Sequence, residues 1–416
     1  MIHRYQKKGL NFVLDVNSGA VHLLDDISYA VSGLLDENMG DTCPQSIIDA
    51  LPDYTADEIR EAYDELYELK KAGQLFAQDD YIDVSRYIPV NAPVKALCLH
   101  VAHDCNLRCQ YCFASTGDFG QGRKIMPPEI AKKAIDFVIA RSGVRHNIEV
   151  DFFGGEPLMA WDTVTQTVDY ARSLEEKYNK KFRFTITTNG LLLDEDKRKY
   201  INENMDNCVL SLDGRREVND EFRKTVAGTG SYDTIVPKFK ALVDERDPNL
   251  DYYARGTFTS HNLDFAEDIL SIADAGFDRL SVEPVTADPG CGYDLTEDDL
   301  PKIEAEYDRL TDIMLERKKE GKPFTFFHFM VDLDQGPCVV KRLRGCGAGY
   351  EYVAVTPDGD IYPCHQFVGK DEFKQGSVLD QSFNMDIAQK FAGMNIYSRP
   401  KCQKCWAKFY CSGGCS

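Results

Sequence analysis

The chain has 416 residues, 43% hydrophobic and 28% charged, a balance typical of a soluble protein with two or three domains. Its formal net charge of −20 argues against a nucleic-acid partner, because phosphate binding needs clustered Lys and Arg. No apolar run approaches the roughly 20 residues that a membrane span needs. The first residues lack the apolar segment of a signal peptide, so a cytoplasmic protein without a membrane anchor is expected.

Residues 1–90 are predicted to form a separate domain. Short strands are expected over residues 11–16 and 20–24, with a turn at Asn17-Ser18-Gly19 between them, and residues 75–77 can return as a further strand. Helical patterns cover residues 27–35, a stretch starting at Pro44, and a stretch from Thr55, which can cap it, to Gly73. A small sheet with three helices resembles a winged helix. With 7 Lys and Arg against 17 Asp and Glu, however, this domain is not expected to bind DNA.

From Val94 to residue 285 the chain alternates between strand and helix patterns, after a proline-containing linker. Strands are predicted over residues 96–101, 148–153, 182–187, 209–212, 252–257 and 279–283. Helical patterns follow most of them, at residues 128–141, 161–177, 195–204, 232–244 and 263–275. This alternation predicts an α/β fold with parallel strands and crossover helices. Residues 286–335 are predicted to be a bridging region containing one long amphipathic helix.

Three cysteines, Cys105, Cys109 and Cys112, follow the first of these strands at C-x3-C-x2-C spacing. Four thiolates would close a structural metal site, whereas three leave one position open for chemistry. Thiolates are soft donors, so the candidates are zinc, cuprous copper and an iron–sulfur cluster. A zinc knuckle or unliganded buried thiols are the alternatives.

This spacing, with the aromatic Tyr111 before the last cysteine, resembles the radical S-adenosylmethionine (SAM) enzymes. The resemblance implies a [4Fe–4S] cluster on Cys105, Cys109 and Cys112, with SAM on its fourth iron, and a partial (β/α)6 barrel. It also implies that a 5′-deoxyadenosyl radical from the cofactor abstracts hydrogen, so no side-chain acid or base is assigned as catalytic. In α/β barrels the chemistry lies at the carboxyl ends of the strands.

Polar motifs follow successive strands of the predicted barrel and resemble the cofactor-binding motifs of that family. Gly154, Gly155 and Glu156 match its GGE motif, which meets the methionine amine of the cofactor. The strand ends that hold ribose and carboxylate are matched by four residues: Thr188, Asn189, Ser211 and Asp213. Arg223 matches an arginine that pairs with the cofactor carboxylate, for which a guanidinium fork is suited. Glu283 ends the sixth strand, near the expected adenine position.

Residues 336–416 are rich in cysteine. Fourteen cysteines without an export signal do not indicate disulfides. Cys43, Cys98, Cys208 and Cys291 are expected to be small apolar core residues. The remaining C-terminal cysteines include a G-x4-C motif at Cys364 and a C-x2-C-x5-C-x3-C run. This pattern resembles the SPASM domain, a module that binds auxiliary iron–sulfur clusters. A zinc ribbon is the alternative. The set is Cys338, Cys346, Cys364, Cys402, Cys405, Cys411 and Cys415.

The SPASM resemblance implies up to two auxiliary [4Fe–4S] clusters. The first would use Cys346, Cys364 and Cys415, and its fourth ligand is either Cys338 or a substrate thiol at an open site. The second would use Cys402, Cys405 and Cys411. The last cysteine of the family pattern is missing at Ser416, so the module is expected to be truncated or that cluster to be open or absent.

The order of an acidic front domain, a radical core and a SPASM region is similar to maturases of "six cysteines in forty-five residues" (SCIFF) peptides. The stretch from Val13 to Gly19 is similar to that particular family. The resemblance implies thioether crosslinks from cysteine sulfur to a carbon, often of Thr, in a precursor peptide whose leader binds residues 1–90. It also implies a low-potential electron donor of the flavodoxin or ferredoxin type.

Two alternatives to a thioether-forming maturase stay open. One is another radical SAM maturase, for sulfatases or quinone cofactors. The other is a non-enzymatic iron–sulfur protein that binds peptides or transfers electrons. The peptide, the crosslinked positions, the carbon attacked, the reductant and the oligomeric state are not given by the sequence.

Overall fold

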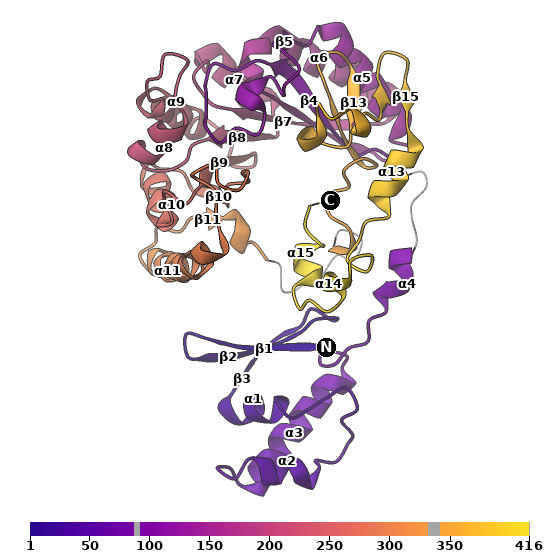
Figure 1. Ribbon diagram of the computed structural model, residues 1–416, viewed down its shortest axis with the longest axis vertical. Coiled ribbons are helices and arrows are strands. Elements are labelled where there is room, and N and C mark those ends of the chain that lie inside the picture. The colour runs from indigo at the N-terminus through magenta and orange to yellow at the C-terminus, as the bar shows by residue number, and fades with distance from the viewer. Residues whose placement is uncertain (87–91, 332–341, 416) are drawn as a thin grey trace. The chain divides into compact units, whose positions relative to one another are not determined.

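A computed structural model describes residues 1–86, 92–331 and 342–415 (Figure 1). The chain divides into two compact units. The first contains residues 1–90, 331–347 and 389–416, and the second contains residues 91–330 and 348–388. Cys338 lies outside the described residues.

The first unit begins with an antiparallel sheet in the order β1-β2-β3. The strands are β1 (Ile2–Lys7), β2 (Leu10–Asp15) and β3 (Val21–Leu24). Four helices follow: α1 (Asp26–Ser32), α2 (Gln45–Ala50), α3 (Ala56–Lys71) and α4 (Tyr81–Arg86). Thr55 caps α3 through a capping box with Glu58, as predicted. The prediction of a strand over residues 75–77 is wrong, and β1 was not predicted.

The C-terminal tail belongs to the same unit as the N-terminal domain. Its short helices α14 (Pro400–Gln403) and α15 (Lys408–Cys411) carry cysteines. Leu14 and Val16 share one apolar cluster with tail residues Ile396 and Phe409. Lys408, which is only 3% exposed, forms an ion pair of 2.7 Å with Asp79. These contacts join residues that the sequence assigned to two separate domains, 1–90 and 336–416.

The second unit contains one large sheet, most of which is parallel. The strand order is β11-β10-β9-β8-β7-β6-β4-β12-β13-β14-β15, and β5 pairs with β4. The parallel barrel strands are β4 (Ala96–His103), β6 (Asn147–Gly154), β7 (Lys181–Thr188), β8 (Asn207–Ser211), β9 (Asp251–Phe258), β10 (Arg279–Pro284) and β11 (Thr325–Phe326), whereas the short β5 (Lys124–Ile125) pairs antiparallel with the end of β4. All six predicted barrel strands are therefore confirmed, with small shifts at their ends.

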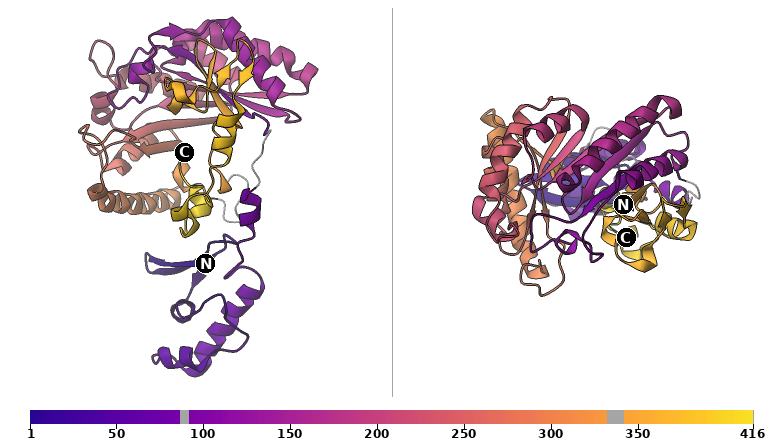
Figure 2. Two further views of the ribbon diagram at one scale, coloured as in Figure 1. Left: turned by 45° about the vertical axis from the view of Figure 1, so that its right-hand side comes forward. Right: turned by 90° about the horizontal axis from the view of Figure 1, so that it is seen from above.

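Crossover helices cover the outer side of the curved sheet (Figure 2). They are α5 (Pro128–Arg141), α6 (Trp161–Tyr178), α7 (Glu195–Asn204), α8 (Arg216–Phe222), α9 (Tyr232–Asp244), α10 (Phe265–Asp274) and α11 (Leu300–Lys319). The core between sheet and helices contains fully buried aromatic side chains such as Phe152, Phe184 and Phe239. Cys98 and Cys208 are buried in the second unit as predicted, but the prediction of a buried Cys291 is wrong because this thiol is exposed.

The sheet continues beyond β4 into the predicted SPASM region. β12 (Tyr352–Val355) pairs in parallel with β4, and β13 (Asp360–Tyr362) pairs antiparallel with β12. The edge is completed by β14 (Gly376–Ser377) and β15 (Ser382–Phe383), and α13 (Met385–Ala392) follows. Residues 348–388 therefore extend the barrel sheet rather than forming an isolated module with the tail.

Candidate active site

A cavity of about 360 Å³ opens at the carboxyl ends of the parallel strands, entirely within the second unit. The ends of β6, β7, β8, β9 and β10 all contribute lining residues, as expected for a barrel of parallel strands. The predicted residues that line it are Cys105, Cys109, Tyr111, Cys112, Gly154, Gly155, Glu156, Thr188, Asn189, Ser211, Arg223 and Glu283. The structure thus brings together predicted residues that lie as far apart in the sequence as Cys105 and Glu283.

The three-cysteine loop that follows β4 is held by the backbone at the end of α8 and just after it. Arg108 donates from its backbone N–H to the carbonyl of Lys224 at 2.8 Å, and Gln110 does the same to Phe222 at 3.3 Å. Two amide donors reach the sulfur of Cys105: the backbone N–H of Leu107 at 3.4 Å and Nδ2 of Asn189 at 3.6 Å. Such N–H donors stabilise sulfur in its thiolate form, which is the form that binds metal.

Cys105, Cys109 and Cys112 all line the cavity. Among the described residues there is no group of three His, Cys, Asp or Glu side chains placed to hold a single metal ion. Three thiols leave a fourth position open, which suits an iron–sulfur cluster with an exchangeable site better than a closed structural zinc site. Burial raises the pKa of Cys105 and of Cys109 to about 12, so cluster binding must displace their protons.

The glycines of the GGE motif let the backbone pass close to the cysteine loop. Gly154 has φ +123°, and a Cβ there would lie 2.2 Å from the carbonyl oxygen of Ala102. A Cβ on Gly155 would lie 2.1 Å from the carbonyl oxygen of Asp104. No side chain fits at either position, so this close approach requires glycine.

Glu156 is a buried carboxyl group at the end of β6 and is fixed by three donors. Its Oε1 accepts from the Leu158 backbone N–H at 3.0 Å and from the Thr188 hydroxyl at 2.8 Å. Its Oε2 accepts from the Asn189 backbone N–H at 2.8 Å. Burial nevertheless raises the pKa of Glu156 to about 7, although the three donors act in the opposite direction. A cationic amine in the cavity would favour the charged form.

The Asp213 carboxylate follows the end of β8 and has three partners in the protein. It accepts from the Tyr111 hydroxyl at 2.6 Å and from the Thr257 backbone N–H at 3.0 Å. Arg223 donates to it from Nη2 at 2.9 Å and pairs with it through Nε at 2.9 Å. Asp213 is fully buried and does not line the cavity, whereas Ser211 does. Asp213 and Arg223 therefore position the cysteine loop, and in the structure the Arg223 fork is occupied by this carboxylate.

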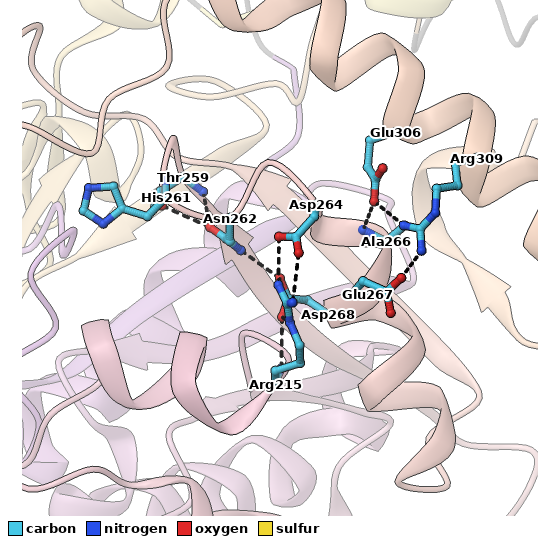
Figure 3. A network of polar contacts seen from close by, with 10 residues as sticks. All are labelled: Arg215, Thr259, His261, Asn262, Asp264, Ala266, Glu267, Asp268, Glu306 and Arg309. Atoms are coloured by element: carbon cyan, nitrogen blue, oxygen red, sulfur yellow. Dashed lines mark hydrogen bonds and ion pairs between the residues drawn. The ribbon is translucent and has the colours of Figure 1, made fainter.

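The turn after β8 that carries Asp213 is anchored to the start of α10 (Figure 3). Arg215 donates from Nε to Asp268 at 2.8 Å and from Nη1 to Asp264 at 2.9 Å. Asn262 donates from Nδ2 to the other oxygen of Asp268 at 3.0 Å. This network fixes the backbone on which the Tyr111 contact depends.

Several lining residues were missed by the sequence reasoning, among them Arg255, His365 and Gln366. Arg255 projects from β9 and forms an ion pair with Glu283 on β10. The β9 pattern, with its even-numbered residues buried, was a signal that Arg255 shares the inner face with Thr257. His365 and Gln366 directly follow Cys364 and also line the cavity. The Tyr352 hydroxyl lies 3.3 Å from Nδ1 of His365 and restricts the orientation of its ring.

The predicted auxiliary ligands are distributed over both units. Cys364 is buried in the second unit, whereas Cys346, Cys402, Cys405, Cys411 and Cys415 belong to the first. Of these, Cys346, Cys411 and Cys415 are exposed. The assignment of ligands to two auxiliary clusters stays a prediction.

Comparison with known families gives two matches along the chain. The model of the radical SAM superfamily matches residues 99–248, and that of the iron–sulfur cluster-binding SPASM domain matches residues 346–406. Together with the three-thiol cavity at the strand ends, these matches define a radical SAM domain followed by a SPASM domain. The chain is homologous to radical SAM maturases.

Among its relatives is a cysteine-type anaerobic sulfatase-maturating enzyme of Clostridium novyi. It is 25% identical over 334 residues, which cover 75% of this chain and 85% of the relative. The mycofactocin maturase MftC of Mycolicibacterium smegmatis is 26% identical, with 78% of this chain and 79% of the relative covered. The radical SAM cyclopropyl synthase TigE of Paramaledivibacter caminithermalis is 24% identical, with 79% and 69% covered.

Two solved structures share the fold. The sulfatase-maturating enzyme anSMEcpe with bound AdoMet has a TM-score of 0.62 and 21% identity, with 78% of this chain and 89% of that chain covered. Streptococcus suis SuiB bound to S-adenosylmethionine has a TM-score of 0.55 and 18% identity, with 100% of this chain and 94% of that chain covered.

In the described part of this chain, no helix combines the length and apolar character needed to cross a bilayer.

Proposed function

We propose that this protein is a radical SAM maturase that installs thioether crosslinks, from cysteine sulfur to carbon, in a ribosomally made cysteine-rich precursor peptide of the SCIFF type. The observation that carries the proposal is the three-thiol cavity, whose wall includes residues next to Cys364. One cavity would thus present the hydrogen-abstracting cofactor and, beside it, a cysteine of the first auxiliary site.

The cavity residues fit the cofactor set of this class. Cys105, Cys109 and Cys112 would hold a [4Fe–4S] cluster, which with SAM supplies a hydrogen-abstracting radical. Glu156 would accept hydrogen bonds from the methionine amine, and Ser211 and Asn189 offer polar contacts at neighbouring strand ends. Structural neighbours that bind SAM share the fold and support this assignment.

Leader recognition is assigned to residues 1–90. Among the described residues no strand pairs with the outer edge of β3, and Val21 and Leu23 on this strand are 36% and 62% exposed. An extended peptide can add to such an edge by main-chain hydrogen bonds, with its side chains against the exposed apolar groups. The domain then serves to bring the precursor to the enzyme.

The first auxiliary cluster would be open to a substrate thiol. Its protein ligands would be Cys346, Cys364 and Cys415, and a substrate thiolate in the fourth position would be held near the carbon to be attacked. The variant Cys338→Ala tests this. Near-normal iron content and crosslinking are expected, with a spectroscopic change on adding a cysteine-containing peptide. Loss of one cluster's iron would show that Cys338 closes the site.

The test of the proposed function is anaerobic reconstitution followed by reduction with dithionite. The parent should cleave SAM to 5′-deoxyadenosine, and a variant with Cys105, Cys109 and Cys112 all changed to Ala should not. Co-expression with a small cysteine-rich peptide should give a product lacking two hydrogen atoms per crosslink by mass spectrometry. Unchanged cleavage by the triple variant would contradict the assignment.

A second candidate is maturation of a sulfatase-like protein, which is favoured by the similarity to sulfatase-maturating enzymes. Modification of a sulfatase-derived peptide, with no change in a cysteine-rich precursor, would support this alternative.

A further inference from the structure

Among the described residues, four Asp, Glu, Lys or Arg side chains line the cavity, and two of them already serve the protein itself. Glu156 accepts three hydrogen bonds and is 1% exposed. Arg223 is bound to Asp213 and is 9% exposed. The other two, Arg255 and Glu283, form an ion pair whose side chains are 49% and 32% exposed. This pair therefore offers the charged hydrogen-bonding groups that a ligand in the cavity can still reach.

Arg255 and Glu283 come from neighbouring parallel strands and share the inner face of the barrel. Ala254 on β9 and Val282 on β10 are buried in the main core, so the residues that follow them, Arg255 and Glu283, project to the opposite face. The register of the two strands places Arg255 beside Ser281, whose hydroxyl donates to Glu283 at 3.3 Å. The carboxylate is therefore oriented from both strands.

The pair has both donors and acceptors left over. A guanidinium has five N–H donors, and Glu283 is the one hydrogen-bond partner of Arg255 within the described part of the chain. A carboxylate has about four acceptor sites, and Glu283 uses two of them, for Arg255 and Ser281. An anion that approaches Arg255 also meets the negative charge of Glu283. A neutral ligand with a carbonyl and an N–H side by side matches this arrangement, and a peptide group is such a ligand.

Apolar side chains continue the same face of β9 toward the start of the strand. Tyr253, two residues before Arg255, packs edge-on against Phe327, with ring centroids 5.5 Å apart. Its hydroxyl lies 3.9 Å from the sulfur of Met330. Phe327 and Met330 are 50% and 60% exposed. Polar groups for the main chain beside apolar groups for side chains are what an extended peptide requires.

We propose that Arg255 and Glu283 bind one peptide group in the main chain of the substrate and so position the neighbouring residue for hydrogen abstraction. This inference rests on the proposed function, since it needs a peptide in the cavity. Arg255 donates to the carbonyl oxygen of that peptide group, and Glu283 accepts its N–H. The proposal assigns Glu283 to the substrate, in place of the adenine contact expected from the sequence. Because a displacement of about 1 Å can slow a reaction about a hundredfold, holding the main chain selects the carbon that is attacked.

The test compares the reconstituted full-length parent with Arg255→Met, reduced by dithionite, with a cysteine-rich precursor peptide as the probe. The readout is the number of crosslinks formed per molecule of 5′-deoxyadenosine released. We expect this ratio to fall by about tenfold or more in Arg255→Met, because the peptide loses a hydrogen bond from a charged group. The crosslinks that still form should shift to neighbouring residues, which tandem mass spectrometry detects.

Arg279→Met is the matched control. Arg279 on β10 forms an ion pair of 2.8 Å with Asp251 on β9, at the other end of the same two strands. Its loss should leave the ratio within about twofold, since a half-exposed ion pair contributes little. The exchanged pair Arg255→Glu/Glu283→Arg keeps opposite charges on the two strands but reverses donor and acceptor, so it should not restore the ratio. An equal fall in Arg279→Met, or recovery in the exchanged pair, would show that Arg255 merely joins the strands and would overturn the proposal.

Main-chain substitution in the probe tests the contact itself. An ester oxygen in place of one peptide N–H removes the donor that Glu283 accepts. At one position beside the crosslinked residue, the ester should lower the ratio by about tenfold in the parent and hardly at all in Glu283→Met. Crosslinking by the parent with no such position would overturn this inference alone. A parent that releases no 5′-deoxyadenosine, or forms no crosslink, would instead contradict the proposed function and this inference with it.

Discussion

The hydroxyl of Tyr111 donates a hydrogen bond of 2.6 Å to Asp213, which lies 102 residues further along the chain. It ties the cysteine loop to the turn after β8, and Arg223 binds the same carboxylate from a third segment. The geometry of the three thiols therefore depends on the buried ion pair between Asp213 and Arg223. Of these two residues only Arg223 lines the cavity.

Removing this hydrogen bond should loosen the cysteine loop. Tyr111→Phe leaves Asp213 with one donor fewer, and a hydrogen bond to a charged group contributes about 1.5–3 kcal/mol. We expect a lower free energy of unfolding by about that amount and faster loss of iron to a chelator. Tyr293→Phe is the control, because Tyr293 donates to the Gln110 carbonyl of the same loop at 2.9 Å without contacting a charge. A larger effect in Tyr293→Phe would contradict the role of Asp213.

Glu156 should make the apoprotein less stable as the pH rises. Its pKa is about 7 in the folded protein against about 4.3 in an unfolded chain, so the folded state binds more protons between these values. The free energy of unfolding contributed by this group therefore falls as the pH rises from about 4.3 to about 7.

Comparison with Glu156→Gln isolates this contribution. The variant cannot ionise, and its amide faces the Asn189 N–H, so it should be less stable than the parent at pH 5. The difference in unfolding midpoint between the two proteins should narrow toward pH 8. Parallel midpoint curves over that interval would show that Glu156 does not titrate there.

The ion pair between Asp79 and Lys408 should hold the tail against the N-terminal domain. Tyr397 also donates to Asp79, so Asp79→Asn leaves a buried ammonium group without its counter-charge. We expect a loss of about 1–3 kcal/mol, below the 3–5 kcal/mol typical of fully buried pairs because the Asp79 side chain is 28% exposed. Lys408→Met removes the charge and should cost less. Chemical denaturation of both single variants and the double variant gives the coupling energy, and a value near zero would contradict the prediction.

The edge of β3 should be needed for precursor binding but not for folding. Leu23→Lys changes a side chain that is already 62% exposed, so the melting temperature should hardly change. Affinity for a fluorescent leader-bearing peptide, measured by anisotropy, should fall by about tenfold if Leu23 contacts the leader. Leu10→Lys, at the 47% exposed start of β2, is the matched control and should bind normally. Equal affinities for all three proteins would remove β3 from the binding site.

The alternation of apolar strands and amphipathic helices was enough to predict the barrel. β4 is mostly apolar, β6 and β7 alternate apolar with polar residues, and the helices between the strands show clear periodicity, so β6 and α7 were placed almost residue by residue. The cavity residues were found because the cofactor motifs lie at strand ends, where parallel topology brings distant segments together.

Other features depend on contacts that no local pattern carries. The ion pair between Arg223 and Asp213 required knowing that α8 returns over the turn after β8. The pairing of β12 with β4 joins segments about 250 residues apart, and the tail joins the N-terminal domain through Leu14, Phe409 and Lys408. Cys291 was misassigned because hydropathy alone does not separate a buried thiol from one on an exposed glycine-rich turn.

The position of β4 between β6 and β12 also constrains the order of folding during synthesis. All eight residues of β4 are buried, yet its partner β12 ends at Val355, close to the end of the chain. During synthesis on the ribosome, the edge of β4 that pairs with β12 therefore stays unpaired until most of the polypeptide has emerged. Such distant pairing slows folding, and it delays closure of the sheet beside the cysteine loop until late in synthesis. Chains that terminate before Tyr352 would leave this edge open to intermolecular strand pairing, so aggregation is their expected fate.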